Sequence, residues 1–410
     1  MNATANVVSR YSWLVVAMLW VVAFLNYLDR ILITSMRDPI VAEFSLNDAQ
    51  FGLLTAVFLW SYGIFSPFGG FIADKYSRKK VIVFSVFVWS VVTLWTGYAT
   101  SFQEMLLSRF LMGISEACYI PAALALITDY HRGRTRSLAT GLHMSGLYAG
   151  LALGGIGGYI ATYYGWRFGF HVFGAFGVVY ALLLLYILKD NKQPAESEDI
   201  ENTNDEKITP FAALKALFGE TSFYVLLFYF AVLGMVNWLV NGWLPTFLKD
   251  QFQLNLGQAG ISATGYIQIG SFIGVILGGI LADRWTRKNN KGRLYMVIIG
   301  FTLGAPFLFL MASTSIFWVA IVAMIIFGLA RGFNDSNLMP ILRQVADGRF
   351  IATGYGVLNF LSTIVGGIMI YVGGALKDAK VDLSIIYQVA AVIMLIATWT
   401  LFTVKIKKSS

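Results

Sequence analysis

The chain is internally duplicated. The segment Gly69–Lys80 (GGFIADKYSRKK) returns as Gly278–Lys288 (GGILADRWTRK), each time where a long apolar stretch gives way to a short basic loop. Two further matches keep the order and nearly the same spacing: Gly113-Ile-Ser-Glu116 with Gly332-Phe-Asn-Asp335, and Arg136-Ser-Leu-Ala-Thr-Gly141 with Arg349-Phe-Ile-Ala-Thr-Gly354. Solenoid units repeat every 20 to 50 residues or so. A much longer repeat predicts two related halves that face each other.

The composition places both halves in a membrane. Hydrophobic residues make up 57% of the chain and charged residues 13%, whereas soluble domains carry roughly 25% charged residues. Twelve apolar stretches approach the roughly 20 residues that a helix needs to cross a bilayer. An open sheet cannot satisfy its backbone in hydrocarbon, and the stretches are about twice as long as barrel strands. We therefore expect an all-α membrane protein with twelve transmembrane helices, at about residues 12–36, 49–73, 81–99, 104–128, 138–162, 168–188, 222–248, 258–283, 294–313, 315–341, 350–375 and 384–404.

The duplication and the charge pattern predict the domains and the orientation. We expect an N-terminal six-helix bundle at 1–188, an acidic cytoplasmic linker at 189–221 and a C-terminal bundle at 222–410. If both termini are cytoplasmic, most Lys and Arg residues lie on the cytoplasmic side, as the positive-inside rule requires. This bias explains the net charge of +8 without a nucleic-acid partner. The prediction is a lipid-embedded monomer in the plasma membrane, specifically a bacterial inner membrane.

Four charged residues fall inside predicted helices: Asp29 and Arg30 in the first, Arg109 and Glu116 in the fourth. Insertion scales assign each such charge a cost of about 2.5 to 3.5 kcal/mol, so these groups must face protein or water. Arg109 and Glu116 are two helical turns apart and share one face, whereas Asp29 and Arg30 point about 100° apart. One interpretation is a functional site. The other is a structural network that pairs Asp29 with Arg109 and Glu116 with Arg30.

Counting charges gives the functional interpretation a mechanism. With both carboxylates ionised the cluster is nearly neutral, but protonation of Asp29 and Glu116 leaves two uncompensated guanidiniums. Because arginine grips a carboxylate through two hydrogen bonds and stays charged, Arg30 and Arg109 would then bind an anion. Accompanying protons also offset the cost of moving an anion into a negative-inside cell.

Other polar residues inside predicted helices are candidates for contacts with a substrate or for gating. Tyr27, His143, Tyr148, Asn237, Asn241 and Asn359 are substrate-binding candidates. Each could instead hydrogen-bond another helix, as isolated polar residues often do in membrane bundles. In the tenth helix, Arg331 and Asp335 are four residues apart and could simply satisfy each other. Their place in the repeat makes them gating candidates as well.

The basic loop segment Gly69–Lys80 resembles the signature between helices 2 and 3 of the major facilitator superfamily. Its second copy, Gly278–Lys288, resembles the degenerate signature between helices 8 and 9. The resemblance implies two pseudo-symmetric six-helix bundles around a central cavity, which rock to give alternating access. It also implies conformational roles for Asp74 and Arg78 and, by repeat, for Asp283 and Arg287.

More narrowly, Asn26-Tyr-Leu-Asp29-Arg30 and the segment from Arg109 to Ala117 resemble the anion:cation symporter branch, which includes sugar-acid and sialin-like organic anion transporters. The charged tenth helix departs from that branch, and spinster-like lipid transporters carry similar charges in the first and fourth helices. The resemblance implies that Arg30 and Arg109 serve the substrate and that Asp29 and Glu116 carry protons.

The expected function is therefore proton-coupled symport of a small organic anion such as a sugar acid. The alternatives are a spinster-like lipid or drug exporter and a membrane sensor that does not transport. An enzyme is not expected, because no nucleophile triad, phosphate loop or metal-ligand cluster occurs and the three histidines are scattered. No cofactor or metal is expected either.

Overall fold

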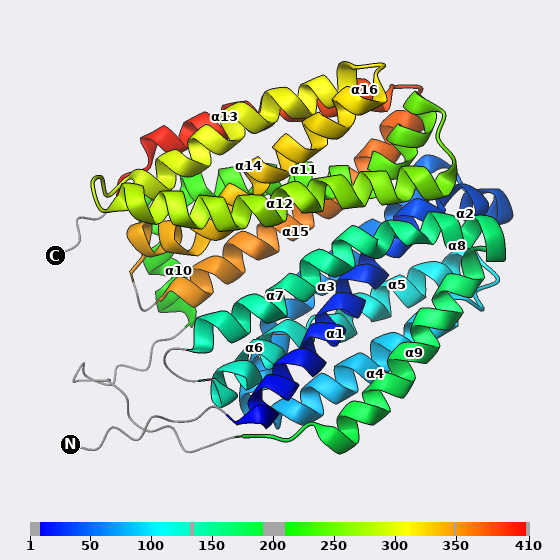
Figure 1. The fold of residues 1–410 in the computed structure, drawn as a ribbon, viewed down its shortest axis with the longest axis horizontal. Helices are drawn as coiled ribbons and strands as arrows, with labels where there is room; N and C mark the ends of the chain where they lie inside the picture. Colours follow the sequence, from blue (N-terminus) through cyan, green and yellow to red (C-terminus); the bar gives the residue numbers. More distant parts are fainter. Residues whose placement is uncertain (1–8, 132–134, 192–209, 348–349, 407–410) are drawn as a thin grey trace.

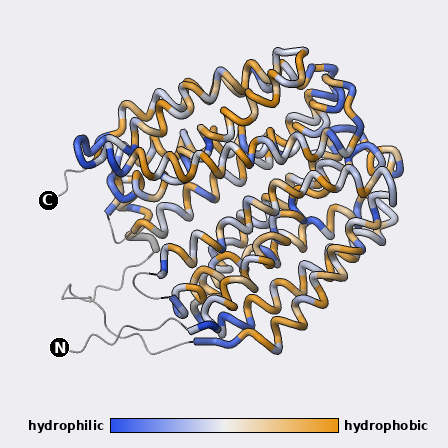
Figure 2. The backbone as a smooth tube through the Cα atoms, in the orientation of Figure 1, coloured by the Kyte–Doolittle hydropathy of each residue, from blue (hydrophilic) through white to orange (hydrophobic). Residues whose placement is uncertain are grey.

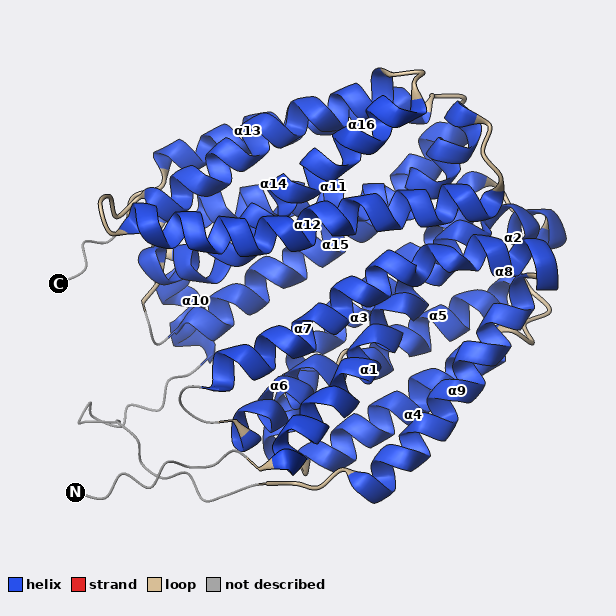
Figure 3. Cartoon of the chain, viewed as in Figure 1, coloured by secondary structure: helices blue, strands red, loops and turns tan. Residues whose placement is uncertain are grey.

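The computed structural model describes residues 9–131, 135–191, 210–347 and 350–406, and these form helices without any strand (Figure 3). The first half contains α1 (Arg10–Leu32), η1 (Ile33–Met36), α2 (Arg37–Phe44), α3 (Asp48–Lys75), α4 (Arg78–Thr96), α5 (Phe102–Glu116), α6 (Tyr119–Tyr130), α7 (Arg136–Leu153), η3 (Gly154–Ile156), α8 (Gly157–Tyr164) and α9 (Trp166–Ile187). The second half contains α10 (Pro210–Phe218), α11 (Thr221–Phe252), α12 (Leu256–Thr286), α13 (Gly292–Ser313), α14 (Phe317–Val345), α15 (Ile351–Asp378), α16 (Leu383–Thr400) and η5 (Leu401–Thr403). Most of the predicted linker, residues 192–209, lies outside the described residues.

Twelve helical spans in the described residues are long and apolar enough to cross a membrane, which confirms the predicted fold class. Hydrophobic residues dominate the helix bodies, and hydrophilic residues gather at the two ends of the molecule (Figure 2). The repeat extends to the helix starts. Asn47 caps α3 by accepting from the backbone N–H of Gln50 at 2.8 Å, and Asn255 caps α12 from Gln258 at 2.8 Å.

Two of the predicted helices are interrupted. The span expected at 104–128 divides at residues 117–118, because Pro121 lacks the N–H that would bond to the carbonyl of Ala117. The Ser115 hydroxyl also donates to carbonyls of the preceding turn, a contact that bends helices. The span expected at 138–162 is interrupted by the 3-10 turn η3, which separates α7 from α8. A Cβ at Gly155 in that turn would stand 2.1 Å from the carbonyl oxygen of Gly260, so the two backbones approach closely.

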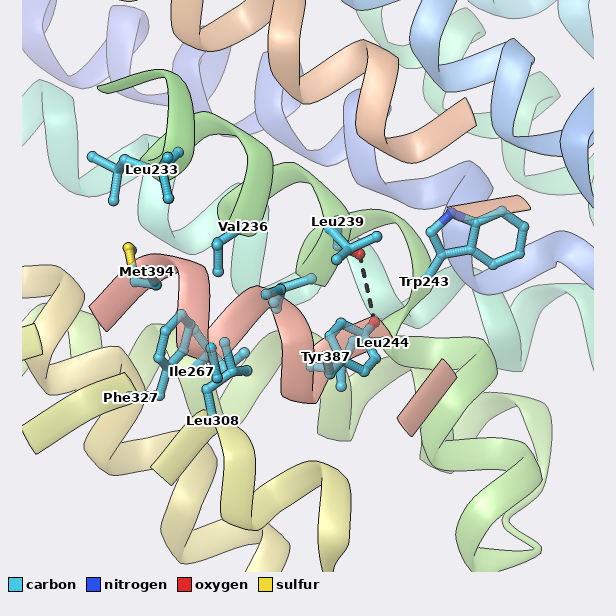
Figure 4. Close-up of a cluster of buried hydrophobic side chains, with 14 of the residues drawn as sticks. Leu233, Val236, Leu239, Trp243, Leu244, Ile267, Leu308, Phe327, Tyr387 and Met394 are labelled. Atoms are coloured by element: carbon cyan, nitrogen blue, oxygen red, sulfur yellow. Dashed lines mark hydrogen bonds between the residues drawn. The ribbon is translucent and has the colours of Figure 1, made fainter. Parts of the chain in front are cut away.

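The helices form two bundles, one from each half, with both chain termini at the same end (Figure 1). Within the bundles, α1 packs on α7 and α4 on α9, while α14 packs on α12 and α13. The core of the second bundle combines side chains from α11, α12, α13, α14 and α16, and Tyr387 donates to the carbonyl of Leu239 at 3.5 Å (Figure 4). Between the bundles, α3 packs on α15, and α7 and α8 pack on α12. In the sequence repeat α3 corresponds to α12 and α7 to α15, so the contact of α3 with α15 corresponds to the contact of α12 with α7.

Ion pairs hold the bundles together at the end opposite the termini. The Asp378 carboxylate accepts from the backbone N–H groups of Asp48 and the following residue, both at 2.8 Å, and so caps α3 of the other bundle. Lys377 bonds to the Asp48 carboxylate at 3.0 Å, and Lys249 pairs with Asp38. We call the end of the interface that these contacts close the sealed end.

The other end of the interface, as far as the described residues reach, lacks these contacts. The hydrogen bonds and ion pairs identified between described residues of the two bundles lie at the sealed end or part-way along the helices, such as Trp60 donating to the Ile364 carbonyl at 3.2 Å. At Gly141 of α7 and Gly356 of α15, a Cβ would meet nothing within 4 Å. The described part of the molecule is therefore held by ion pairs at one end, and α7 and α15 leave open space beside these two glycines at the other end.

Candidate functional site

The ion pair between Arg30 and Glu116 lies in the interior of the first bundle. Arg30 Nε donates to Glu116 Oε2 at 2.8 Å, and the two side chains are 2% and 0% exposed. Glu116 is the last residue of α5, so the interruption of this span places its carboxylate against α1. This pairing is one of the two that the structural interpretation predicted.

Aromatic rings cover the Arg30 guanidinium. Its central carbon lies 4.3 Å from the Tyr62 ring centroid, 4.5 Å from Tyr27 and 5.3 Å from Phe58. Such cation–π contacts stabilise a desolvated guanidinium by about 2 kcal/mol. Of the predicted substrate-binding residues, Tyr27 therefore lies directly on Arg30. Tyr62 and Phe58 were not predicted from the sequence, because aromatic residues are common in apolar helices.

Asp29 and Arg109 do not form the predicted ion pair within 4.0 Å. Asp29 accepts from the Thr93 hydroxyl of α4 at 3.3 Å, because it points about 100° away from Arg30. Arg109 is fully buried and donates to the Leu54 carbonyl at 3.4 Å and to the Met112 sulfur at 3.1 Å. The structure therefore gathers the four predicted charges in one bundle but pairs only two of them directly.

The cluster leaves several polar atoms without hydrogen bonds. The buried atoms without a hydrogen-bond partner are Asn26 Nδ2 and Oδ1, Asp29 Oδ1, Arg30 Nη2, Arg109 Nη2 and Glu116 Oε1. A buried group without a partner costs about 1 to 3 kcal/mol, and more when it is charged. Stability alone does not account for this arrangement, since hydrophobic residues of similar volume often replace buried ion pairs without loss.

The second bundle contributes a more exposed pair. Arg331 Nε lies 3.9 Å from Asp335 Oδ2, with side-chain exposures of 12% and 28%. Asp335 Oδ2 also accepts from the Tyr148 hydroxyl of α7 at 3.2 Å, so this carboxylate contacts the opposite bundle. Asn334 donates to Asp335 Oδ1 at 3.3 Å and accepts from Tyr229 at 2.8 Å.

The remaining candidates for substrate contacts differ in accessibility. His143 is fully buried beside Tyr119, with both ring nitrogens lacking a partner. Asn237, Asn241 and Asn359 are partly buried in α11 and α15. In this conformation His143 is therefore enclosed in its bundle, whereas the three asparagines lie nearer to a surface.

The loop residues bond within their own bundles. Arg78 pairs with Asp129 and donates to the Ala125 carbonyl at 3.0 Å. Asp283 pairs with Arg293, and Arg287 is an exposed residue at the end of α12. The side chain of Asp74 lies outside the described part of the structure. Neither Arg78 nor Asp283 bonds to the facing bundle in this conformation.

No group of three or more His, Cys, Asp or Glu side chains in the described ranges is arranged to hold a metal ion. The polar chemistry of the described structure is instead that of arginine, carboxylate, tyrosine and asparagine side chains. These groups can bind an anion and exchange protons.

Three comparisons bear on the family. A family model described as Major Facilitator Superfamily matches residues 19–371. Protein spinster homolog 1 of Xenopus tropicalis is 28% identical over 381 residues, which cover 88% of this chain and 67% of the relative. The probable sulfoacetate transporter SauU of Cupriavidus necator is 27% identical over 366 residues, which cover 85% of this chain and 84% of the relative. A crystal structure of a bacterial homolog of the human lysosomal transporter spinster, in an inward-facing and unoccupied conformation, matches with a TM-score of 0.80. That match has 22% sequence identity and covers 98% of this chain and 100% of the other.

Proposed function

Because the chain belongs to the Major Facilitator Superfamily and is a multi-pass membrane transporter rather than an enzyme, we propose that it carries a small organic anion together with protons. The observation that carries this proposal is the buried pair of Arg30 and Glu116. One nitrogen of the guanidinium and one oxygen of the carboxylate in this pair have no hydrogen-bond partner.

Protonation of Glu116 would remove the charge that neutralises Arg30. The guanidinium would then attract a substrate anion, and the charge of that anion would in turn be compensated inside the bundle. Asp29 would act with Glu116 as a second proton acceptor, and Arg109 would add positive potential to the same interior. Tyr27 and Tyr62 cover Arg30 in this conformation, so an anion would reach it only after these rings move.

The sulfoacetate transporter among the relatives supports an anionic substrate, since sulfoacetate carries both a sulfonate and a carboxylate. We propose that this chain takes sulfoacetate or a sugar acid of similar charge. We also propose an orientation with both termini in the cytoplasm of a bacterial cell, which would make the sealed end extracellular and the described conformation inward-open.

The test is uptake into proteoliposomes of radiolabelled sulfoacetate and D-gluconate, with and without an inward proton gradient. The wild-type protein should accumulate one of these anions only when the gradient is present. Glu116→Gln should abolish gradient-driven accumulation but retain exchange of the anion across the membrane. Accumulation of the anion without a gradient would disprove the coupling.

A second candidate function is export of an amphiphile. The relationship to spinster homolog 1 favours it, and so does a cavity of about 670 Å³ between α3, α4 and α5, which is lined mainly by apolar side chains such as Val88, Val92 and Leu111. A fluorescent lipid in the same vesicles distinguishes the two functions. Proton-driven movement of the lipid, with no uptake of either anion, would favour export.

A further inference from the structure

The arginines in the membrane-spanning helices differ in how freely they can meet an anion. Arg109 is 0% exposed and Arg30 is 2% exposed, and Arg30 is already bonded to Glu116 and covered by rings. Arg331 is 12% exposed. It donates no hydrogen bond to any residue in the described ranges, and its Nε is buried without a partner.

Asp335, the acid beside Arg331, does not form a hydrogen bond with the Arg331 guanidinium. The distance of 3.9 Å between Arg331 Nε and Asp335 Oδ2 exceeds the 2.7 to 3.2 Å or so of a hydrogen bond, so the pair is only a loose electrostatic contact. The planar guanidinium fork is therefore available to grip a carboxylate or sulfonate through two hydrogen bonds.

The surroundings of Arg331 suit a polar ligand. Tyr148 from α7 donates to Asp335 directly, and Tyr229 from α11 donates to Asn334, which in turn donates to Asp335. Helices α7, α11 and α14 thus meet here with hydroxyl and amide groups, and Arg331 and Asp335 are the charged members of the group.

The repeat makes Asp335 the counterpart of Glu116, since Gly113-Ile-Ser-Glu116 aligns with Gly332-Phe-Asn-Asp335. Both acids lie beside an arginine, but Glu116 is enclosed in its bundle and Asp335 borders the opposite one. The duplication has therefore produced one buried carboxylate and one at the interface.

We infer that Arg331 receives the acidic group of the transported anion and that Asp335 takes up a proton as it does so. This inference rests on the proposed function and adds a second substrate contact, in the second bundle, to the one proposed for Arg30. The charges of Arg331 and Asp335 cancel, so entry of an anion would leave a net negative charge in the membrane interior, which is costly. A proton on Asp335 restores neutrality.

Protonation would also act on the interface between the bundles. The bond from Tyr148 to an ionised Asp335 is charge-assisted and roughly twice as strong as a bond between neutral groups. When Asp335 becomes neutral, this cross-bundle contact weakens. Binding of the anion and loosening of the interface are thereby linked through one carboxylate.

The experiment is isothermal titration calorimetry of the purified full-length protein with sulfoacetate and with D-gluconate, in buffers of different ionisation enthalpy. These buffers report how many protons are taken up per anion. Arg331→Gln should weaken binding about 10- to 100-fold, as expected for loss of hydrogen bonds to a charged group. Arg343→Gln is the matched control, since this arginine is exposed on the same helix.

Asp335→Asn should bind the anion with one proton fewer than wild type, and Asp382→Asn, an exposed acid at the start of α16, should not change the count. Arg331→Lys, which keeps the charge but not the fork, should show intermediate affinity and covers the case in which Arg331→Gln does not fold. Unchanged affinity in both Arg331 variants, or an unchanged proton count in Asp335→Asn, overturns the inference. Failure of the wild-type protein to bind either anion overturns the proposed function itself, and the inference with it.

Discussion

Removal of the Asp378 carboxylate should open the sealed end. This side chain belongs to the second bundle, yet it accepts from the first two backbone N–H groups of α3 in the first bundle, both at 2.8 Å. Those groups have no partner within their own helix and carry the positive end of its dipole. The contact therefore exists only while the two bundles are together at this end.

The size of the effect follows from the geometry. Replacement of a capping side chain by alanine costs about 0.5 to 2 kcal/mol, and an acid at a helix N-terminus contributes a further 0.3 to 1 kcal/mol or so. Because Asp378 is exposed, part of this energy is screened. We expect Asp378→Ala to shift the equilibrium by about 2 kcal/mol, or roughly 30-fold, towards the state that is open at this end. Asp378→Asn keeps one acceptor oxygen and should have a smaller effect.

The assay is a distance distribution between two spin labels across the sealed end. The single native cysteine is removed as Cys118→Ala, and cysteines are placed at the exposed positions Tyr163 and Asp382, one in each bundle. Asp378→Ala should add a longer-distance population, whereas Asp250→Ala, an exposed acid on α11, should not. An unchanged distribution in Asp378→Ala, or an equal change in the control, would refute the reasoning.

Three further predictions concern packing and the buried charges. Gly113→Ala should lower thermal stability by about 1 to 3 kcal/mol, because its Cβ would stand 2.5 Å from a backbone oxygen of α3, whereas Gly141→Ala should not, because its Cβ would meet nothing within 4 Å. A melting curve that is the same for both variants would contradict this packing. Thr93→Val should destabilise the protein by about 1 to 3 kcal/mol, because the described structure gives Asp29 no other hydrogen-bond donor; a neutral result in the same melting assay would show that Asp29 finds another partner. Gly155→Leu should open the sealed end in the spin-label assay, since its Cβ would lie 2.1 Å from a backbone oxygen of α12. A distance distribution that stays the same as in the wild type would disprove that the two helices cross this closely.

The sequence predicted the fold because its signals are local or repeated. Apolar length reveals each span, and the second copy of the loop motif reveals the two halves. The helix interruption at residues 117–118 was missed, although Pro121 was visible, because proline within a membrane helix is often tolerated. The cap of α3 by Asp378 was also missed. It joins residues 330 positions apart, and nothing near Asp378 in the sequence marks it.

The sequence predicted which charged residues form the candidate site, but only some of the contacts between them. Charges inside apolar helices mark Asp29, Arg30, Arg109 and Glu116 with little ambiguity. Which acid bonds to which arginine depends on helix rotation and on the neighbouring spans, so the pair of Arg30 and Glu116 formed and a direct pair of Asp29 with Arg109 did not. Thr93 could not be singled out, since hydroxyl residues are frequent in membrane helices and carry no periodic signal.

In the proposed orientation, the medium around the cell affects the stability of the sealed end. Its cross-bundle contacts are formed by charged groups at an exposed edge, and the Debye length falls from about 10 Å at 0.1 M salt to about 3 Å at 1 M. The backbone approach of Gly155 to Gly260 involves no ions and is insensitive to salt. In that orientation, a higher external salt concentration should weaken the ion pairs at the sealed end but not the neighbouring backbone contact, so the fraction of the protein that is closed at this end would fall as external salinity rises.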